Sequence, residues 1–391
     1  KAVASGSNIA LTRAIAAIDD LIDMTMGAPF LTCGCDTGRI ARMRTQSDNA
    51  SINRLVRGLV PIGKALDPTD QDDFVQVIAR VSERMRRAAH NVSAEEIARA
   101  MRVFSDVDWA DAPARLVSQR IRQATALLPR PSRITRAVLP IITSRLGTVA
   151  RRTRANLITA LGLARVEPSF GRIDNRVLSH MTSSQALFVT DAMTGRNERW
   201  SAQARSIVRG GLEQGLGTDA ISARLRSALG APATLRRQAN YWDVIATVFS
   251  NRARTFAHLS SLRDGGINEY TIEAIMDEAT SIQCRLLHGK TFKVEQALAR
   301  YTQVQQAPEP EAVRELMPWI RSRRVAGQNQ LYVPRPGGAE TIIADEVRTG
   351  AGRLDDPGTF RNVSPTDALA SIGVLVPPFH AMCRTTIVAN I

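Results

Sequence analysis

The residues of this 391-residue chain whose types and spacing could support chemistry are concentrated in two short segments near its C-terminal end. They are Asp277, Thr280, Cys284, Gly289, His380, Cys383 and Arg384. His380 and Cys383 have the H-x-x-C spacing of a metal-ligand pair, and Cys284 could supply a third ligand. Asp277 or His288 is the candidate for a fourth. Imidazole and thiolate ligands in this mixture suit zinc in tetrahedral geometry, so the sequence allows a zinc site.

The same side chains also allow a purely structural interpretation. Asp277, Thr280 and His380 could form a buried hydrogen-bond network that holds the last strand, with the cysteines as small apolar core residues. Because one short-spaced pair is present in place of two C-x-x-C knuckles, we prefer this interpretation and keep zinc as the alternative. Cys33 and Cys35 are too close in sequence for an easy structural disulfide and stay unassigned.

The elements before these segments are expected to be helices as far as residue 265. Ser93-Ala-Glu-Glu96 is typical of a capping box that opens a helix, and Thr218 is a plausible N-cap for a helix closed by Gly230. The longest clear helix keeps apolar residues at helical spacing from Trp242 to Leu259 and stops at Asp264-Gly265-Gly266. Its other face carries Asn251, Arg252, Arg254 and His258.

After Gly266 the pattern changes to short strands. Strands are predicted over 270–276, 291–294 and 384–388, with a short helix near 311–320. The stretch 303–370 is rich in Pro, Gly and polar residues and is expected to be an inserted loop region or subdomain. The predicted fold class is α+β, with a predominantly helical N-terminal body and a small mixed α/β C-terminal module. The expected domains are a helical Arg-rich region (1–170), a second helical region (171–266) and the C-terminal module (267–391).

The charge of the chain is strongly basic and unevenly distributed. There are 51 basic and 37 acidic residues, a net charge of +14, and all but four of the basic residues are Arg. The segment from Ala112 to Val166 contains eleven Arg and no acidic residue. A segment this one-sided favours a polyanionic partner, either nucleic acid or an acidic protein surface, over solvated helix faces. The candidates to face DNA are Arg115, Arg120, Arg122, Arg130, Arg133, Arg136, Arg145, Arg151, Arg152 and Arg154.

The order of the two C-terminal segments resembles a known family. Asp277-x-x-Thr280-x-x-x-Cys284-x-x-x-x-Gly289-Lys290-x-Phe292, followed by Pro377-Pro-x-His380-x-x-Cys383-Arg384, is similar to the Mu F-like family of phage head morphogenesis (minor head) proteins. Arg252-x-Arg254-Thr255 and Gly265-Gly266-Ile267-x-x-Tyr270 also look like that family's helix and its exit into the first strand. The resemblance covers roughly 202–391. It departs from the family at Thr385, where a cysteine is usual, and in the long stretch between Gly289 and His380.

The resemblance implies a structural role in a virion. Such a protein is expected inside the capsid near the portal protein, after assembly in the host cytoplasm, in contact with packaged double-stranded DNA. It would assist head assembly or DNA ejection, with scaffold or major capsid protein as further partners. Arg contacts to phosphate would be insensitive to base sequence and strongly dependent on salt. No run of 18 apolar residues occurs, so no membrane partner is expected.

Two other classes of function stay open on the sequence. The first is a zinc-stabilised nucleic-acid-binding protein built around the Cys and His residues. The second is an ADP-ribosyltransferase-like virion enzyme, because Ala279-Thr280-Ser281 faintly resembles a segment of those enzymes. Their fold also needs a Glu-x-Glu pair on an active-site strand. The one instance near the module is Glu309-Pro310-Glu311, and proline disfavours a strand there, so we expect no enzyme activity.

Overall fold

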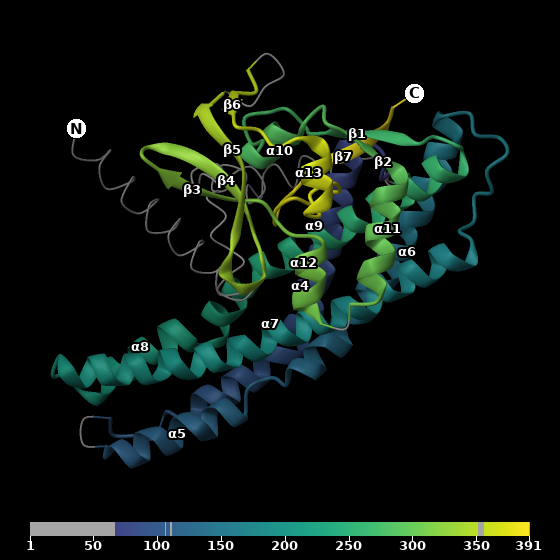
Figure 1. Ribbon diagram of the computed structural model, residues 1–391. Coiled ribbons are helices and arrows are strands. Elements are labelled where there is room, and N and C mark those ends of the chain that lie inside the picture. The colour runs from purple at the N-terminus through teal and green to yellow at the C-terminus, as the bar shows by residue number, and fades with distance from the viewer. Residues whose placement is uncertain (1–66, 106, 110–111, 308, 351–355, 391) are drawn as a thin grey trace, which may run out of the picture.

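A long helical body dominates the computed structural model, which describes residues 67–390 apart from 106, 110–111, 308 and 351–355 (Figure 1). Its helices are α4 (Gln71–Arg102), α5 (Ala114–Ala126), α6 (Pro131–Ala160), α7 (Arg172–Glu213), α8 (Thr218–Leu229) and α9 (Ala231–Asp264). The helix predicted to start at Thr218 is confirmed as α8, but its N-cap is Gly217 and not Thr218, and no side chain of the described residues caps it. The helix predicted from Trp242 onward is confirmed as part of α9, which begins earlier, at Ala231. Cys33 and Cys35 lie outside the described residues.

The first described helix corrects one prediction. The capping box at Ser93–Glu96 does not open a helix, because α4 runs without a break through these residues and Ser93 is buried inside it. The helix begins earlier, at the N-cap Asp70, whose carboxylate accepts a hydrogen bond from the backbone N–H of Asp73. Apolar residues on both sides of Ser93 keep the same buried face, so packing carries the helix past a local start signal.

Helix α9 lies at the centre of the body, between α4 and α6, and carries the apolar residues that its sequence spacing predicted. Trp242, Phe249 and Leu259 are all buried in its core. The helix ends at Asp264 with Gly265 as its C-cap, and the following Gly266 has a φ of 75°, the left-handed conformation that glycine adopts most readily. The next residue, Ile267, then donates its N–H back to the carbonyl of Leu262 and directs the chain into the first strand.

A three-stranded antiparallel sheet follows α9, in the order β2-β1-β7. Its strands are β1 (Glu269–Glu273), β2 (Thr291–Lys293) and β7 (Thr386–Ala389), close to the predicted strands. The short helix α10 (Ile282–Leu287) lies between β1 and β2, and α11 (Val294–Gln305) follows β2. Pairing of Ile272 in β1 with Ile387 in β7 brings the C-terminal end of the chain beside the start of the module.

The predicted loop region 303–370 folds into an ordered subdomain. After α12 (Pro310–Leu316), a four-stranded antiparallel sheet has the order β3 (Arg321–Val325), β4 (Gln328–Pro334), β5 (Glu340–Arg348) and β6 (Thr359–Arg361). The helical turn η1 (Pro336–Gly338) joins β4 to β5, and α13 (Thr366–Ser371) returns the chain to the core. The expectation for this stretch was an inserted loop region or subdomain; four paired strands form here, and Gly327 and Pro336 to Gly338 lie in the turns between them.

Two hydrophobic cores hold the described residues together. The larger core runs from Phe74 in α4 to Ile387 in β7 and joins α4, α6, α7 and α9 to both sheets. The smaller core lies in the arm formed by α5, α8 and the adjoining ends of α4 and α7, around Trp109 and Trp200 (Figure 1). This arrangement is an α+β fold, as predicted. Among the described residues no helix is both long and apolar enough to span a membrane.

Candidate metal centre

The structure brings three of the sequence-predicted residues into one buried cluster. The Sγ atom of Cys284 lies 3.1 Å from Nε2 of His380 and 3.7 Å from Sγ of Cys383. The three residues are only 3%, 8% and 0% exposed, respectively. Cys284 comes from α10, whereas His380 and Cys383 come from the turn that precedes β7, 96 and 99 positions further along the chain. These side chains could hold a metal ion.

The spacing of the three ligand atoms can be compared with a zinc centre. Two thiolates on one tetrahedral zinc, with bonds of about 2.3 Å, lie about 3.8 Å apart. The 3.7 Å between the sulfurs of Cys284 and Cys383 matches this distance. A thiolate and an imidazole nitrogen would lie about 3.6 Å apart, so the His380 ring would have to move by about 0.5 Å. The donor set therefore fits a Cys₂His centre after a small side-chain adjustment.

The fourth predicted ligand is not supplied by the residues proposed for it. Asp277 lies with both carboxylate oxygens 2.7 Å from one guanidinium nitrogen of Arg384, and the Nδ1 of His288 accepts from the backbone N–H of Ala274. Thr385 is buried and hydrogen-bonds to the sulfur of Cys284. A fourth position at the cluster would therefore hold a water molecule or a hydroxyl group.

Local hydrogen bonds position α10 and its cysteine. The Asp277 carboxylate accepts from the N–H of Ala279 and from the Thr280 hydroxyl, which itself accepts from the N–H of Asp277. The next residue, Ser281, caps α10 by accepting from the N–H of Cys284, and its hydroxyl lies 2.9 Å from Nε2 of His380. The Asp277–Thr280 turn and the cluster are therefore consecutive parts of one network. Gly289 ends the segment in a turn with φ 78° that leads into β2.

The polar face of α9 holds the backbone that leads into β7. The Asn251 amide donates to the carbonyls of Cys383 and Thr385, at 2.9 and 3.1 Å. The guanidinium of Arg254 donates to the carbonyls of Arg384 and Thr385, and Nδ1 of His258 lies 3.0 Å from the carbonyl oxygen of Ile387. These buried side chains were visible in the sequence as one helix face. Their partners were not, because they are backbone atoms about 130 positions away.

The two buried thiols have opposite pKa shifts. Burial raises the pKa of Cys284, and the adjacent Cys383 raises it further. Burial acts in the same direction on Cys383, but the hydrogen bond from Cys284 and the charge of His380 outweigh it, so the pKa of Cys383 lies well below its usual value. The pair therefore favours one thiolate and one thiol, and a bound cation would favour two thiolates.

The predicted structural network is thus present in part. Asp277 and Thr280 do bond to each other and, through Arg384, to the segment before β7. His380 was predicted to bond to Asp277 and Thr280, but in the structure its ring bonds to Ser281 and Cys284. Holding the last strand falls mainly to α9, which the sequence interpretation had not assigned to this role.

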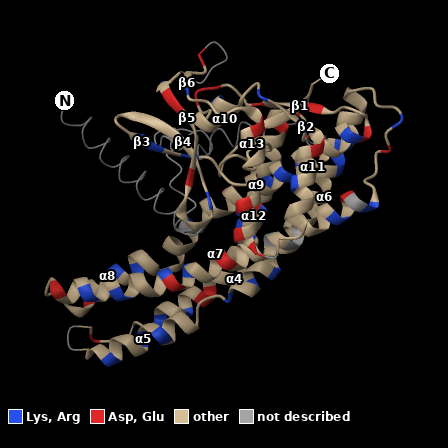
Figure 2. Ribbon diagram, viewed as in Figure 1, with Lys and Arg blue, Asp and Glu red and all other residues tan. Residues whose placement is uncertain are grey.

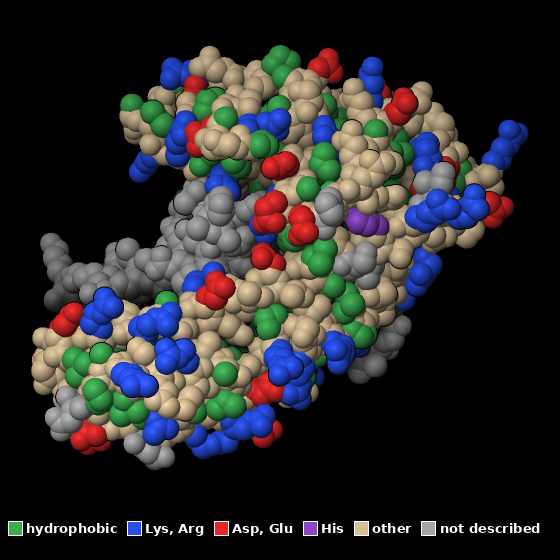
Figure 3. All heavy atoms as spheres, turned by 60° about the horizontal axis from the view of Figure 1, so that its bottom comes forward, with side chains coloured by type: hydrophobic (Ala, Val, Ile, Leu, Met, Phe, Trp, Pro, Cys, Tyr) green, Lys and Arg blue, Asp and Glu red, His purple; other side chains and the backbone are tan. Residues whose placement is uncertain are grey.

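The Arg-rich segment divides into exposed and buried side chains. The exposed residues among the DNA-facing candidates are Arg115, Arg122, Arg130, Arg133, Arg136, Arg151 and Arg152, and Arg120 and Arg145 are half-buried. Arg residues recur along α5 and α6 (Figure 2), and basic side chains gather over the underside of the helical body (Figure 3). Arg133 forms an ion pair with Glu96 of α4, so that part of its charge is balanced.

The prediction that Arg154 faces DNA is wrong, because its side chain is buried. It is 2% exposed and donates to the carbonyl of Glu167, to Ser260 and to Asp264. Its guanidinium also lies 5.1 Å from the centre of the Phe170 ring. Arg154 therefore joins α6 to the end of α9. The prediction failed because its acidic partner, Asp264, lies 110 positions away, outside the acid-free segment.

Helix α4 adds basic residues that the acid-free segment did not include. Burial and the charges of Arg84, Arg152 and Arg80 lower the pKa of Arg145, which places four guanidinium groups near one another across α4 and α6. Arg80 and Arg84 are both exposed. Mutual repulsion of this kind is relieved when an anion binds.

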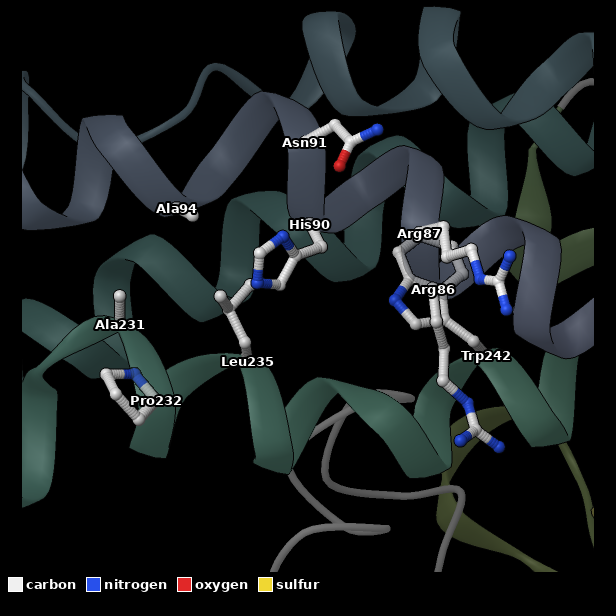
Figure 4. Close-up of a pocket in the computed structure, with 9 residues that line it drawn as sticks. All are labelled: Arg86, Arg87, His90, Asn91, Ala94, Ala231, Pro232, Leu235 and Trp242. Carbon is white, nitrogen blue, oxygen red and sulfur yellow. The ribbon is translucent and has the colours of Figure 1, made fainter.

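A hollow between α4 and α9 is also lined by two arginines, Arg86 and Arg87 (Figure 4). His90 of α4 and Leu235 of α9 lie on opposite sides of it, and Trp242 contributes to its apolar wall. Its two arginines are already paired, Arg86 with Asp243 and Arg87 with Glu83. This hollow therefore offers little uncompensated charge to a ligand.

Comparison of the chain with protein-family models, with curated proteins and with solved structures finds no match.

Proposed function

We propose that this chain is a minor head (head morphogenesis) protein of a phage virion, associated with the portal protein inside the capsid. The observation that carries the proposal is the assembly of the ordered motif into one site. Cys284 and Cys383 lie 3.7 Å apart, and Asp277 pairs with Arg384 across 107 positions of sequence. A motif shared by chance would have no reason to meet in the fold, so the contacts support the resemblance that the sequence suggested.

The proposed role includes contact with packaged double-stranded DNA. Exposed arginines of α5 and α6, together with Arg80 and Arg84 of α4, would supply the phosphate-binding groups. Helices α5 and α6 themselves contain no acidic residue. The protein would lie in the capsid interior near the portal and assist head assembly or DNA ejection. Scaffold or major capsid protein are further proposed partners.

The proposed role needs no catalysis. The Glu-x-Glu candidate begins a helix, with Glu309 as the N-cap of α12 and Glu311 in its first turn. An active-site strand is therefore not formed at this position, which weakens the ADP-ribosyltransferase-like alternative. We propose a virion component without turnover.

Zinc is the metal proposed for the cluster of Cys284, His380 and Cys383. Its role would be structural, because the ligands are buried and join α10 to the segment before β7. We expect about one zinc per chain in protein purified without chelator, with loss of the metal and a lower melting temperature in Cys383→Ser. Ser93→Ala, at a buried position of α4, is the control for a small buried change. Absence of zinc in the parent protein under these conditions would refute the assignment.

A second candidate function rests on this same cluster. A zinc-stabilised nucleic-acid-binding protein would use the metal to hold its C-terminal module and the arginines to bind phosphate. It differs from the first proposal in needing no portal protein. Both candidates predict DNA binding, so DNA binding alone does not separate them.

The experiment that separates them is to mix the purified chain with its neighbouring portal protein and image the product by electron microscopy. Defined density on the portal ring supports the minor head role. A chain that stays apart from the portal, yet contains zinc and binds DNA tightly, supports the second candidate.

The DNA-binding role is tested on the same preparation by salt titration of duplex binding. Arg145→Ala, Arg151→Ala and Arg152→Ala in combination should reduce the slope of log K against log salt by about 1 for each phosphate that the variant no longer neutralises. Arg87→Ala, at an exposed arginine already paired with Glu83, is the matched control. An unchanged slope in the triple variant would remove α6 from the proposed DNA-facing surface.

A further inference from the structure

A second hollow lies where α11, α12 and α13 meet the turn after β4. Its volume is about 520 Å³. The lining side chains that matter here are Arg300, Gln303, Glu315, Leu316, Arg335 and Ile372. This volume is in the range of pockets for small organic molecules, which is about 300–1,000 Å³.

Two arginines converge in this hollow. A terminal guanidinium nitrogen of Arg300 donates to the carbonyls of Ala370 and Ser371, at 3.1 and 3.3 Å. A terminal nitrogen of Arg335 lies 3.4 Å from the carbonyl oxygen of Ile372. Because these are consecutive carbonyls, whose Cα atoms are about 3.8 Å apart, the two guanidinium groups are close neighbours. Burial and the charge of Arg335 together lower the pKa of Arg300.

No ion pair among the described residues balances the positive charge of this pair. Within the described part of the chain neither Arg300 nor Arg335 forms an ion pair, and each uses one terminal nitrogen for its carbonyl contacts. The acidic side chain in the lining is Glu315, which is exposed and makes no ion pair among the described residues. The hollow of Figure 4 differs in this respect, because both of its arginines are paired with carboxylates.

The backbone around the pair is well fixed. The N–H of Arg335 donates to the carbonyl of Ala339 at 2.8 Å, which closes the turn that presents the side chain. Gly373, with φ 89°, lies directly against the carbonyl of Leu316, so that the chain after α13 approaches the end of α12 closely. A site with its donors already in place loses little ordering entropy when a ligand binds.

From this geometry we propose that the hollow binds a small phosphate monoester of about nucleotide size. The free donors of two adjacent guanidinium groups match a phosphate dianion in charge and in two-pronged geometry. Phosphate alone would leave most of the volume empty. The organic part of the ligand lies against Leu316 and Ile372, with the amide of Gln303 available for a polar contact. This proposal does not depend on the portal-associated role.

Titration calorimetry on the full chain tests the proposal with three probes: adenosine 5′-monophosphate, inorganic phosphate and succinate. We expect saturable binding of the nucleotide, weaker binding of inorganic phosphate and no binding of succinate. Equal binding of nucleotide and inorganic phosphate would overturn the contribution of the organic part. Succinate binding as tight as that of the nucleotide would overturn the assignment to phosphate, and no saturable binding of any probe would overturn the site.

Variants connect the binding to the two arginines. Arg335→Gln removes one charge and only one long hydrogen bond, so the fold should persist while the Kd for the nucleotide rises about 10-fold or more. Arg300→Lys keeps the charge but loses the planar fork, and it should also weaken binding. Arg324→Gln, an exposed arginine of β3, is the matched control and should leave the Kd unchanged. An unaltered Kd in Arg335→Gln, with an unaltered melting temperature, would overturn the proposal.

Discussion

Acidification should destabilise this protein through one buried histidine, His258 of α9. Its Nδ1–H donates to the carbonyl of Ile387, and its buried Nε2 has no hydrogen-bond partner among the described residues. Burial is the main reason that its pKa is lowered to about 4, and the nearby charge of Arg254 lowers it further. The bond to Ile387 and the charge of Asp67 oppose this shift but do not outweigh it.

The sign and size of the effect follow from proton binding. In the unfolded chain His258 takes up a proton below a pH of about 6.5, whereas in the folded protein it does so only below about 4. Between these values the unfolded state binds more protons, so the free energy of unfolding falls as the pH falls. The full difference corresponds to about 3 kcal/mol, of which about 2 kcal/mol should be lost between pH 7.5 and 5.

Urea unfolding measured by circular dichroism at pH 7.5, 6 and 5 would test this prediction. His258→Asn keeps an N–H for the carbonyl of Ile387 but does not titrate, so its stability should change by about 2 kcal/mol less than that of the parent over this range. His90→Asn, at an exposed histidine, should retain the parent's pH dependence. A His258→Asn protein that loses as much stability as the parent between pH 7.5 and 5 would refute the reasoning.

Three further substitutions test other parts of the fold. Arg154→Met should lower the free energy of unfolding by about 2–4 kcal/mol, because its bonds to Asp264 and a backbone carbonyl are removed, while DNA affinity in a salt titration stays unchanged. Arg285→Ala leaves Glu346 buried without its 3.0 Å ion pair and should cost about 3–5 kcal/mol in urea unfolding, part of which a second change, Glu346→Leu, should restore. Gly373→Ala places a Cβ 2.4 Å from a carbonyl oxygen at φ 89°, so scanning calorimetry should show a clearly lower melting temperature; an unchanged one would contradict the close approach described.

Much of the helical body and of the local site could be predicted from the sequence. The apolar spacing of α9 and its glycine stop predict the helix because a period of 3.6 residues and a terminal Gly are local properties. The turn joining Asp277 to Thr280 and the short spacing of His380 and Cys383 are local as well. Each of these features depends on residues within a few turns of one another, so the chain order alone specifies it.

Local signals also misled where packing overrode them. The capping box at Ser93 was a valid start signal, but the continuous apolar face of α4 buries that residue in the middle of a helix. The turn residues of 303–370 concealed four strands, although each of these strands pairs with its neighbour in sequence, as Val325 of β3 does with Gln328 of β4.

The tertiary structure decided which distant groups meet. Cys284 lies beside Cys383, and Arg154 points inward to Asp264. Arg300 lies near Arg335 in the hollow at α13. The physical reason is that each of these contacts joins elements brought together by burial of a shared apolar core, and burial is not directional. Composition and spacing identify which residues could react or bind, and only the packed chain determines which of them are paired, buried or left with free charge.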